Sequence, residues 1–209
     1  MRRVFVDPAA PQRDAIEEAA KWIASGYLVA IPTDTLYGLA VDPFRAEAVE
    51  RLFMVKGRSS DQPIPLIAAD AAQIAATLAP LTGIAAKMAE RCWPGPLTLV
   101  IRAPRTIAAA VTAGTGTVGV RVPNHDVARA IARTCGRPVT ATSANISGQP
   151  ATGDPNLVEE TLGDRVDMLV DTGPTVGGAP STIVDVTGAA PRLVRAGAIA
   201  WEDIQRWLS

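Results

Sequence analysis

Most of the side chains that could do chemistry in this sequence are hydroxyls and cations that stand next to short apolar runs. Five clusters of this kind occur, at residues 32–39, 56–58, 140–148, 180–185 and 195–197. Hydroxyls and cationic side chains can orient and neutralise anions without forming covalent bonds to them. The clusters therefore favour chemistry by substrate placement and charge stabilisation, with no side-chain nucleophile required.

Histidine occurs only once, as His125. A metal centre built from several histidines is therefore excluded, and a Ser-His-Asp or Cys-His arrangement would depend on this one residue. Because the run Pro123-Asn124-His125-Asp126 comes where a helix is predicted to begin, we expect His125 to be an exposed residue of the first turn.

Each polar cluster also has a purely structural interpretation. The hydroxyls of Thr33 and Thr35 could orient a small polar substrate at the end of a buried strand, or they could cap a turn. The cations of the Lys56-x-Arg58 pair fit phosphates, but they would also complement the C-terminal end of a helix dipole. Residues 140–148 could surround an anion with backbone amides and hydroxyls, or they could form an ordinary turn.

Three segments rich in glycine or proline are interpreted separately. No Gly-x4-Gly-Lys-Ser/Thr phosphate loop occurs in the sequence. Residues 114–119 match Gly-x-Gly-x-x-Gly, but an alternating β-branched run follows where a dinucleotide site needs a helix, so we interpret them as a flexible lead into a strand. Residues 93–98 are expected to form a stiff structural corner. Residues 173–180 suit either a loop that approaches a ligand or a plain surface turn.

The elements that must position these clusters alternate between helix and strand, which predicts an α/β fold with a twisted mixed β-sheet flanked by helices. Apolar spacing predicts helices over residues 12–25, 46–55, 71–78, 82–92, 127–135 and 201–208. Short apolar or alternating runs predict strands over residues 27–31, 65–68, 97–101, 117–122 and 138–141. Further elements are expected over residues 157–162, 168–170, 183–186 and 193–195, and residues 32–45 are predicted to be a loop.

The composition limits the function classes. The chain has 209 residues, 48% of them hydrophobic, which fits one globular domain over residues 1–209. The 20 Lys and Arg residues against 21 Asp and Glu residues give a net charge of −1, so we expect no overall attraction to nucleic acid or to an anionic membrane. The two cysteines complete no metal or disulfide framework, and no apolar run reaches signal-peptide or transmembrane length. We therefore expect a cytoplasmic protein without membrane association.

Seven segments together resemble the YrdC-like threonylcarbamoyl-AMP synthase family in order and spacing. They are the Pro-Thr-Asp-Thr-x-Tyr-Gly-Leu run at 32–39, Lys56-x-Arg58, Trp93-Pro-Gly-Pro-Leu-Thr98, Arg121-x-Pro123, Thr142-Ser-Ala-Asn145 with Ser147-Gly148, Ser181-Thr-Ile183 and Arg195-x-Gly197. The resemblance runs from Ile16 to Gly197. It implies a single YrdC-like domain with a concave basic cleft, similar to the short, single-domain form of the family.

The resemblance also implies a reaction. In this family L-threonine, bicarbonate and ATP form threonylcarbamoyl-AMP and pyrophosphate, which is a nucleotidyl transfer. The product supplies the threonylcarbamoyl group that another enzyme places on the adenosine beside the tRNA anticodon. This tRNA threonylcarbamoyl-transfer machinery is therefore the expected downstream partner, and Mg²⁺ is expected to bridge the leaving pyrophosphate.

Site residues follow from the same resemblance, position by position. Lys56 and Arg58 are expected to be the catalytic cations, and replacing either with alanine is expected to remove most pyrophosphate release while leaving the fold intact. The expected threonine contacts are Thr35, Ile67, Arg121, Ala141 and Ser181. The expected ATP contacts are Lys56, Arg58, Gln62, Thr117, Ser143, Asn145, Ala151 and Arg195, and no metal held by protein side chains is expected. Two positions depart from the pattern of some members, because Gln62 stands where an asparagine often does and Ile67 where some relatives have histidine.

Two other functions fit the same residues. One is a paralogue of this fold that acts on another carbamoylated substrate, and the other is a non-catalytic RNA-binding module that uses the basic cleft. The net charge of −1 and the lack of an aromatic-rich stretch argue against the module, although weak RNA binding beside the enzyme activity is compatible with the sequence.

Overall fold

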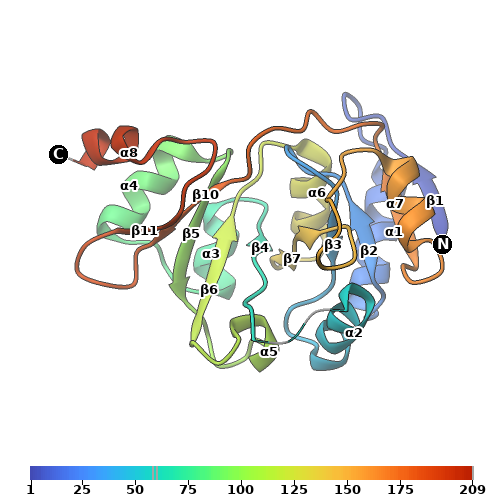
Figure 1. Ribbon diagram of the computed structural model, residues 1–209, viewed down its shortest axis with the longest axis horizontal. Coiled ribbons are helices and arrows are strands. Elements are labelled where there is room, and N and C mark those ends of the chain that lie inside the picture. Colours follow the sequence, from blue (N-terminus) through green and yellow to red (C-terminus); the bar gives the residue numbers. More distant parts are fainter. Residues whose placement is uncertain (58, 60, 209) are drawn as a thin grey trace.

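The computed structural model describes residues 1–57, 59 and 61–208, and the strands divide between two mixed sheets (Figure 1). The first sheet has the strand order β1 (Arg2–Phe5), β9 (Met168–Asp171), β2 (Val29–Ile31), β3 (Gly38–Ala40) and β8 (Thr142–Ser143). Strands β1 and β2 lie parallel to β9 on its two sides, whereas β3 is antiparallel to both β2 and β8.

The second sheet has the strand order β11 (Arg192–Arg195), β10 (Thr182–Asp185), β5 (Leu97–Arg102), β6 (Thr117–Arg121), β4 (Leu66–Ile67) and β7 (Val139–Thr140). Strand β10 is parallel to β5, and β4 is parallel to β6, while the other neighbours are antiparallel.

The sequence predicts a single mixed sheet, and the structure differs at residues 139–143. Thr140 pairs with Leu66 in the second sheet, and Ser143 pairs with Gly38 in the first. The chain therefore crosses from one sheet to the other at Ala141. Two strands of two residues each have no periodicity that could reveal such a crossing, so it is set by the pairing partners.

Helices cover both faces of the first sheet. Helices α1 (Arg13–Ala24) and α6 (Asp126–Thr134) pack together, and α2 (Ala46–Lys56) and α7 (Pro155–Leu162) contribute to the larger core. Successive residues of a strand point to opposite faces. Accordingly, Val29 and Ile31 join the smaller core with α1 and α6, while Ala30 joins the larger core with α2 and α7.

The second sheet packs one face against the larger core. Leu97, Leu99 and Ile101 of β5 belong to the larger core, together with Val118 and Val120 of the neighbouring β6. Helices α3 (Ala71–Thr77), α4 (Gly83–Cys92), α5 (Ala109–Thr112) and α8 (Trp201–Leu208) also contribute side chains to this core. The alternate residues of β5 and β6 face away from the core, so this second face of the sheet is available to line a site.

Most predicted elements are confirmed to within one or two residues. The alternation expected for β5 and β6 and the helical spacing expected for α1, α2, α4 and α8 give elements at those places. Four short elements are missing from the sequence-based assignment: β1, β3, β8 and α5. Strand β3 lies inside the segment predicted to be a loop and is stabilised by its pairing with β2 and β8. In the described part of the chain, no helix is both long enough and apolar enough to cross a membrane.

Candidate functional site between the two sheets

A cavity of about 560 Å³ lies between the two sheets, and we call it the inter-sheet cavity. Its floor is the non-core face of the second sheet, because Thr98 and Val100 of β5 and Gly119 and Arg121 of β6 line it. Other strands of the second sheet add Leu66, Ile67, Ile183, Val194 and Arg195. Residues at the end of the first sheet and in the connecting loops complete the lining: Thr33, Thr35, Leu36, Tyr37, Gly38, Gln62, Pro63, Ile64, Pro65, Ala141, Thr142, Ser143, Gly178, Pro180 and Ser181. This volume suits a small-molecule ligand.

Arg121 ends β6 at the wall of this cavity and is only 8% exposed. Its Nη1 lies 2.9 Å from Oδ1 of Asp34, but the two atoms make no hydrogen bond of good geometry, and both are buried without another partner in the described residues. Burial lowers the pKa of Arg121, Asp34 opposes that shift, and the positive charge of Arg195 adds to it. A buried guanidinium that lines a cavity is suited to a carboxylate ligand, because it carries several N–H donors in a planar fork.

Ser181 stands on the opposite side of the cavity floor, just before β10. Its Oγ lies 2.8 Å from the Oγ1 of Thr98, and Nη2 of Arg195 donates to the Ser181 carbonyl oxygen at 2.8 Å. Burial lowers the pKa of Arg195. In the described lining of the inter-sheet cavity the charged side chains are Arg121 and Arg195, and both are cations.

The hydroxyls of Thr33 and Thr35 lie 3.1 Å apart in the turn that follows β2. Thr33 Oγ1 donates to the Leu36 carbonyl oxygen at 2.6 Å and accepts from the Thr35 backbone N–H at 3.2 Å, so it caps the turn. Both residues line the cavity. The Thr35 carbonyl oxygen accepts from Thr175 Oγ1 at 2.7 Å and from the Gly177 N–H at 3.1 Å. The glycine-rich loop at 173–180 therefore lies against this turn, and its Gly178 reaches the cavity wall.

A second, smaller cavity of about 440 Å³ adjoins the first, and we call it the lysine cavity. Its described lining is Lys56, Gly57, Ser59, Asp61, Gln62, Thr142, Ser143, Asn145, Ser147 and Gly148. Gln62, Thr142 and Ser143 line both cavities. A ligand with two parts could therefore occupy both at once.

Lys56 ends α2 and is buried at 3% exposure. Its Nζ donates to the carbonyl oxygens of Ser143 and Asn145 at 2.6 and 3.0 Å and to Oδ1 of Asn145 at 3.0 Å. The Lys56 ammonium group thus binds the 143–148 loop. It does not merely complement the C-terminal dipole of its own helix, which was the structural interpretation of this residue. Replacing Lys56 with alanine would leave these acceptors buried without a donor, so we now expect a local disturbance of the fold where the sequence suggested none.

Most of the residues expected at the site meet in these two cavities. The inter-sheet cavity brings together Thr35, Ile67, Arg121, Ala141 and Ser181, with Gln62, Ser143 and Arg195 beside them, and the lysine cavity adds Lys56 and Asn145. Thr117 and Ala151 line neither cavity, although Thr117 shares a strand face with Gly119 and Arg121. The remaining expected residue, Arg58, lies outside the described residues.

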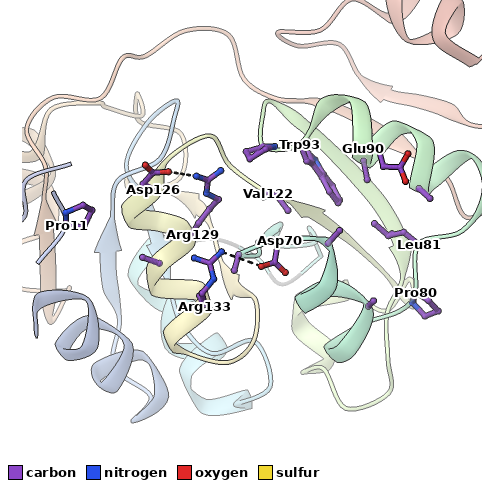
Figure 2. A pocket seen from close by; sticks show the side chains of 17 residues that line it. Pro11, Asp70, Pro80, Leu81, Glu90, Trp93, Val122, Asp126, Arg129 and Arg133 are labelled. Atoms are coloured by element: carbon purple, nitrogen blue, oxygen red, sulfur yellow. Dashed lines mark hydrogen bonds and ion pairs between the residues drawn. The ribbon is translucent and has the colours of Figure 1, made fainter. Parts of the chain in front are cut away.

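A larger hollow of about 780 Å³ lies elsewhere, between α3, α4 and α6 (Figure 2). Alanines line much of it, Trp93 stands on one side, and Arg129 and Arg133 of α6 face it beside Asp126 and Asp70. No residue expected at the site lines this hollow. Its greater volume is therefore not a reason to move the candidate site away from the two adjoining cavities.

The sequence-based assignment gave no site role to Thr98, which lines the inter-sheet cavity, or to Asp34, which pairs with Arg121. Thr98 belongs to the segment 93–98, which the sequence analysis interpreted only as a structural corner. Trp93 does stabilise this corner, because its indole N–H donates to the Leu97 carbonyl oxygen at 2.7 Å. Asp34 lies in the 32–39 run but was given no role. The signal for Thr98 was a hydroxyl at a non-core position of an alternating strand.

His125 differs from the expectation of an exposed residue. It precedes α6 and is half-buried, and its Nδ1 is buried without a hydrogen-bond partner in the described chain. Burial lowers its pKa, and the nearby carboxylates of Asp34 and Asp126 oppose that shift. One of the charged groups near His125, the Asp34 carboxylate, therefore comes from the 33–36 turn, and the sequence around His125 does not reveal this neighbour.

A family model and curated relatives place this chain in the same protein family. The Sua5/YciO/YrdC family model, described as "Telomere recombination", matches residues 21–197. The threonylcarbamoyl-AMP synthase of Pyrococcus abyssi is 37% identical over 199 residues, which are 93% of this chain and 58% of that protein. The threonylcarbamoyl-AMP synthase of Vibrio vulnificus is 37% identical over 158 residues, which are 74% of this chain and 84% of that protein. The chain thus spans less than two thirds of the Pyrococcus protein.

Solved structures agree with this result. The crystal structure of Pyrococcus abyssi Sua5 complexed with L-threonine superposes with a TM-score of 0.93 at 35% identity, covering 100% of this chain and 61% of that one. Escherichia coli YciO superposes with a TM-score of 0.85 over 96% of this chain and 98% of that one, at 24% identity, so it supports the fold alone.

Proposed function

This chain belongs to the Sua5/YciO/YrdC family, and from that premise we propose that it is an L-threonylcarbamoyladenylate synthase, a nucleotidyltransferase. Its substrates would be L-threonine, bicarbonate and ATP, and its products threonylcarbamoyl-AMP and pyrophosphate. One structural observation carries the proposal. Thr35, Arg121 and Ser181 line a cavity that shares Gln62, Thr142 and Ser143 with the cavity of Lys56, so an amino acid and a triphosphate would meet there.

The amino acid would occupy the inter-sheet cavity. Its carboxylate would accept from the guanidinium of Arg121, which lines the cavity and is buried and therefore weakly screened by water. The unprotonated threonine amine would add to CO₂ with loss of one proton to solvent, or would react with bicarbonate with release of one water molecule, and either route gives a carbamate at the border of the two cavities. One carbamate oxygen would then attack the α-phosphorus of ATP, and the bond from that phosphorus to the pyrophosphate oxygen would break.

The chain's contribution to this step is placement and counter-charge. Arg195 and Ser143 would face the phosphates from the inter-sheet cavity, and Asn145 and Gln62 from the lysine cavity. Lys56 holds the 143–148 loop through its bonds to Ser143 and Asn145, which fixes the backbone that would surround the phosphates. A proton-accepting histidine is not required, because carbamate oxygen is already anionic.

Mg²⁺ would enter as part of the nucleotide. Magnesium in such sites is held largely by substrate phosphates and water. The described residues contain no group of three or more His, Cys, Asp or Glu side chains able to hold a metal ion. The Mg²⁺ ion would neutralise charge on the leaving pyrophosphate.

We place the product in tRNA modification, with a tRNA threonylcarbamoyl-transfer enzyme downstream and the cytoplasm as the compartment. The relatives named threonylcarbamoyl-AMP synthase support the part of this proposal that concerns tRNA modification. Weak RNA binding beside this activity would fit the cationic cavity lining.

Release of pyrophosphate tests the proposal. The protein is incubated with ATP, Mg²⁺ and bicarbonate, with and without L-threonine, and pyrophosphate and threonylcarbamoyl-AMP are measured. We expect threonine-dependent release with formation of the adenylate. Release without threonine would favour a paralogue with another carbamoylated substrate. No release, together with tight and salt-sensitive RNA binding, would favour a non-catalytic RNA-binding module.

A further inference from the structure

Thr98 is a buried hydroxyl at the floor of the inter-sheet cavity, and the reaction proposed above gives it no task. It is 3% exposed and comes from β5, whose parallel pairing with β10 sets Thr98 opposite Ile183. Its Oγ1 lies 2.8 Å from the Oγ of Ser181, and within the described chain this is its one side-chain hydrogen bond. Thr98 therefore touches the residue that the proposed function assigns to the amino acid.

The protons of this pair can be assigned from their partners. Arg195 can only donate, and its Nη2 lies 3.3 Å from the Ser181 Oγ, so it occupies one lone pair of that oxygen. If Ser181 donated to Thr98, the Thr98 proton would have no protein acceptor in the described chain, and at 3% exposure little water could replace one, which is unfavourable. Donation from Thr98 to Ser181 satisfies both groups and leaves the Ser181 proton directed to the cavity.

The position of the Thr98 side chain is fixed by its surroundings. Its Cγ2 methyl group lies over Gly119 of β6, where a Cβ atom would come within 3.1 Å of it. The absence of a side chain at Gly119 therefore leaves room for this methyl group. With the methyl group held there, the hydroxyl faces Ser181.

We infer that Thr98 is a positioning residue that donates its hydroxyl proton to Ser181 and thereby presents Ser181 to the cavity as a hydrogen-bond donor. The ligand group that faces Ser181 must then be an acceptor, such as an oxygen of the amino acid, and an ammonium group is disfavoured. This inference rests on the proposed function for the identity of the amino acid, but the geometry of the pair does not depend on it.

A double-mutant cycle tests the inference on the full chain. L-threonine binding is measured by calorimetry for the wild type, Thr98→Val, Ser181→Ala and the double variant. We expect Thr98→Val, which keeps the shape and removes the hydroxyl, to weaken binding on the order of tenfold. The double variant should bind no more weakly than Ser181→Ala, because Thr98 acts only through Ser181. Thr98→Ser should restore wild-type binding.

Thr140→Val is the matched control. Thr140 is fully buried, and its hydroxyl bonds the Val41 N–H and the Leu39 carbonyl oxygen, but it does not line the cavity. We expect it to lower the melting temperature and leave threonine affinity unchanged. Additive losses in the double variant, or a Thr98→Val protein that binds like wild type while Ser181→Ala does not, would overturn the inference.

A crystal structure of ligand-free Thr98→Val separates this inference from the proposed function. We expect the Ser181 side chain to leave its present rotamer, because its donor is lost. An unchanged Ser181 rotamer would refute the positioning role even if threonine binds. Failure of the wild type to bind threonine would instead refute the proposed substrate, and the rotamer would still decide the role of Thr98.

Discussion

The ion pair between Arg121 and Asp34 predicts that stability and ligand binding can be separated by mutation. The guanidinium and carboxylate atoms are 2.9 Å apart, and the two side chains are only 10% and 13% exposed. Arg121→Gln removes the cation and leaves the Asp34 carboxylate largely buried, with the Asn124 N–H as its remaining donor at 3.1 Å. The double variant Arg121→Gln, Asp34→Asn removes both charges.

The expected magnitudes follow from this burial. Breaking a buried ion pair from one side costs about 3–5 kcal/mol. The retained Asn124 bond favours the lower end, so we expect a loss of about 3 kcal/mol for the single variant, or about 6–12 °C in melting temperature for a chain of this size. The double variant should recover most of that loss. Threonine affinity should fall about 10- to 150-fold in both, because a hydrogen bond to a charged group contributes about 1.5–3 kcal/mol.

Thermal unfolding and calorimetric binding of L-threonine measure the two effects in parallel. The matched control is Arg51→Gln with and without Asp167→Asn, a half-buried pair that bonds at 2.5 and 2.9 Å and lines neither cavity. It should change stability but not binding. If the Arg121 double variant bound threonine like wild type, Arg121 would not hold the carboxylate. If the single variant were as stable as the double, the pair would not be the buried ion pair that we describe.

Three further predictions concern the surroundings of the site. A Cβ at Gly197 would come within 2.5 Å of the backbone at Ser181, so Gly197→Ala should displace Ser181 at the cavity wall and lower activity at least tenfold. A Cβ at Gly188 would have no neighbour closer than 3.8 Å, so Gly188→Ala should be neutral. Steady-state rates of the two variants test this difference. His125 has a lowered pKa because it is buried, so the unfolded chain takes up its proton first as the pH falls below about 6.5. The wild type should accordingly lose more melting temperature between pH 7.5 and 5.5 than His125→Gln, and equal losses would contradict this reasoning. Burial raises the pKa of Cys135 to about 12, so Ellman's reagent at pH 8 should react with it only after unfolding, and rapid reaction of the native protein would count against that burial.

The local sequence was sufficient for the elements with a clear period. Apolar residues at helical spacing predicted α1, and a short apolar run predicted β5, but the sequence analysis assigned no cavity-facing role to Thr98, which the structure places on the non-core face of that strand. The local sequence was insufficient for strands of two to four residues, such as β3 and β8, which have too few residues to show a period. These strands exist because each is hydrogen-bonded to a neighbour from elsewhere in the chain.

The candidate site was likewise predictable from the sequence only in part. Residue types and spacing singled out Thr35, Lys56, Ser143 and Ser181 before any coordinates, because hydroxyls and cations beside strands are visible in the sequence, and the family resemblance added Arg121. Only the tertiary structure decided that the chain crosses between two sheets at Ala141 and so forms a cavity between them. It also decided that Asp34 faces Arg121 and that Thr98 faces Ser181 across 83 positions. Such contacts depend on which strands pair and in which register, and these are set by the packing of the whole core rather than by neighbours in sequence.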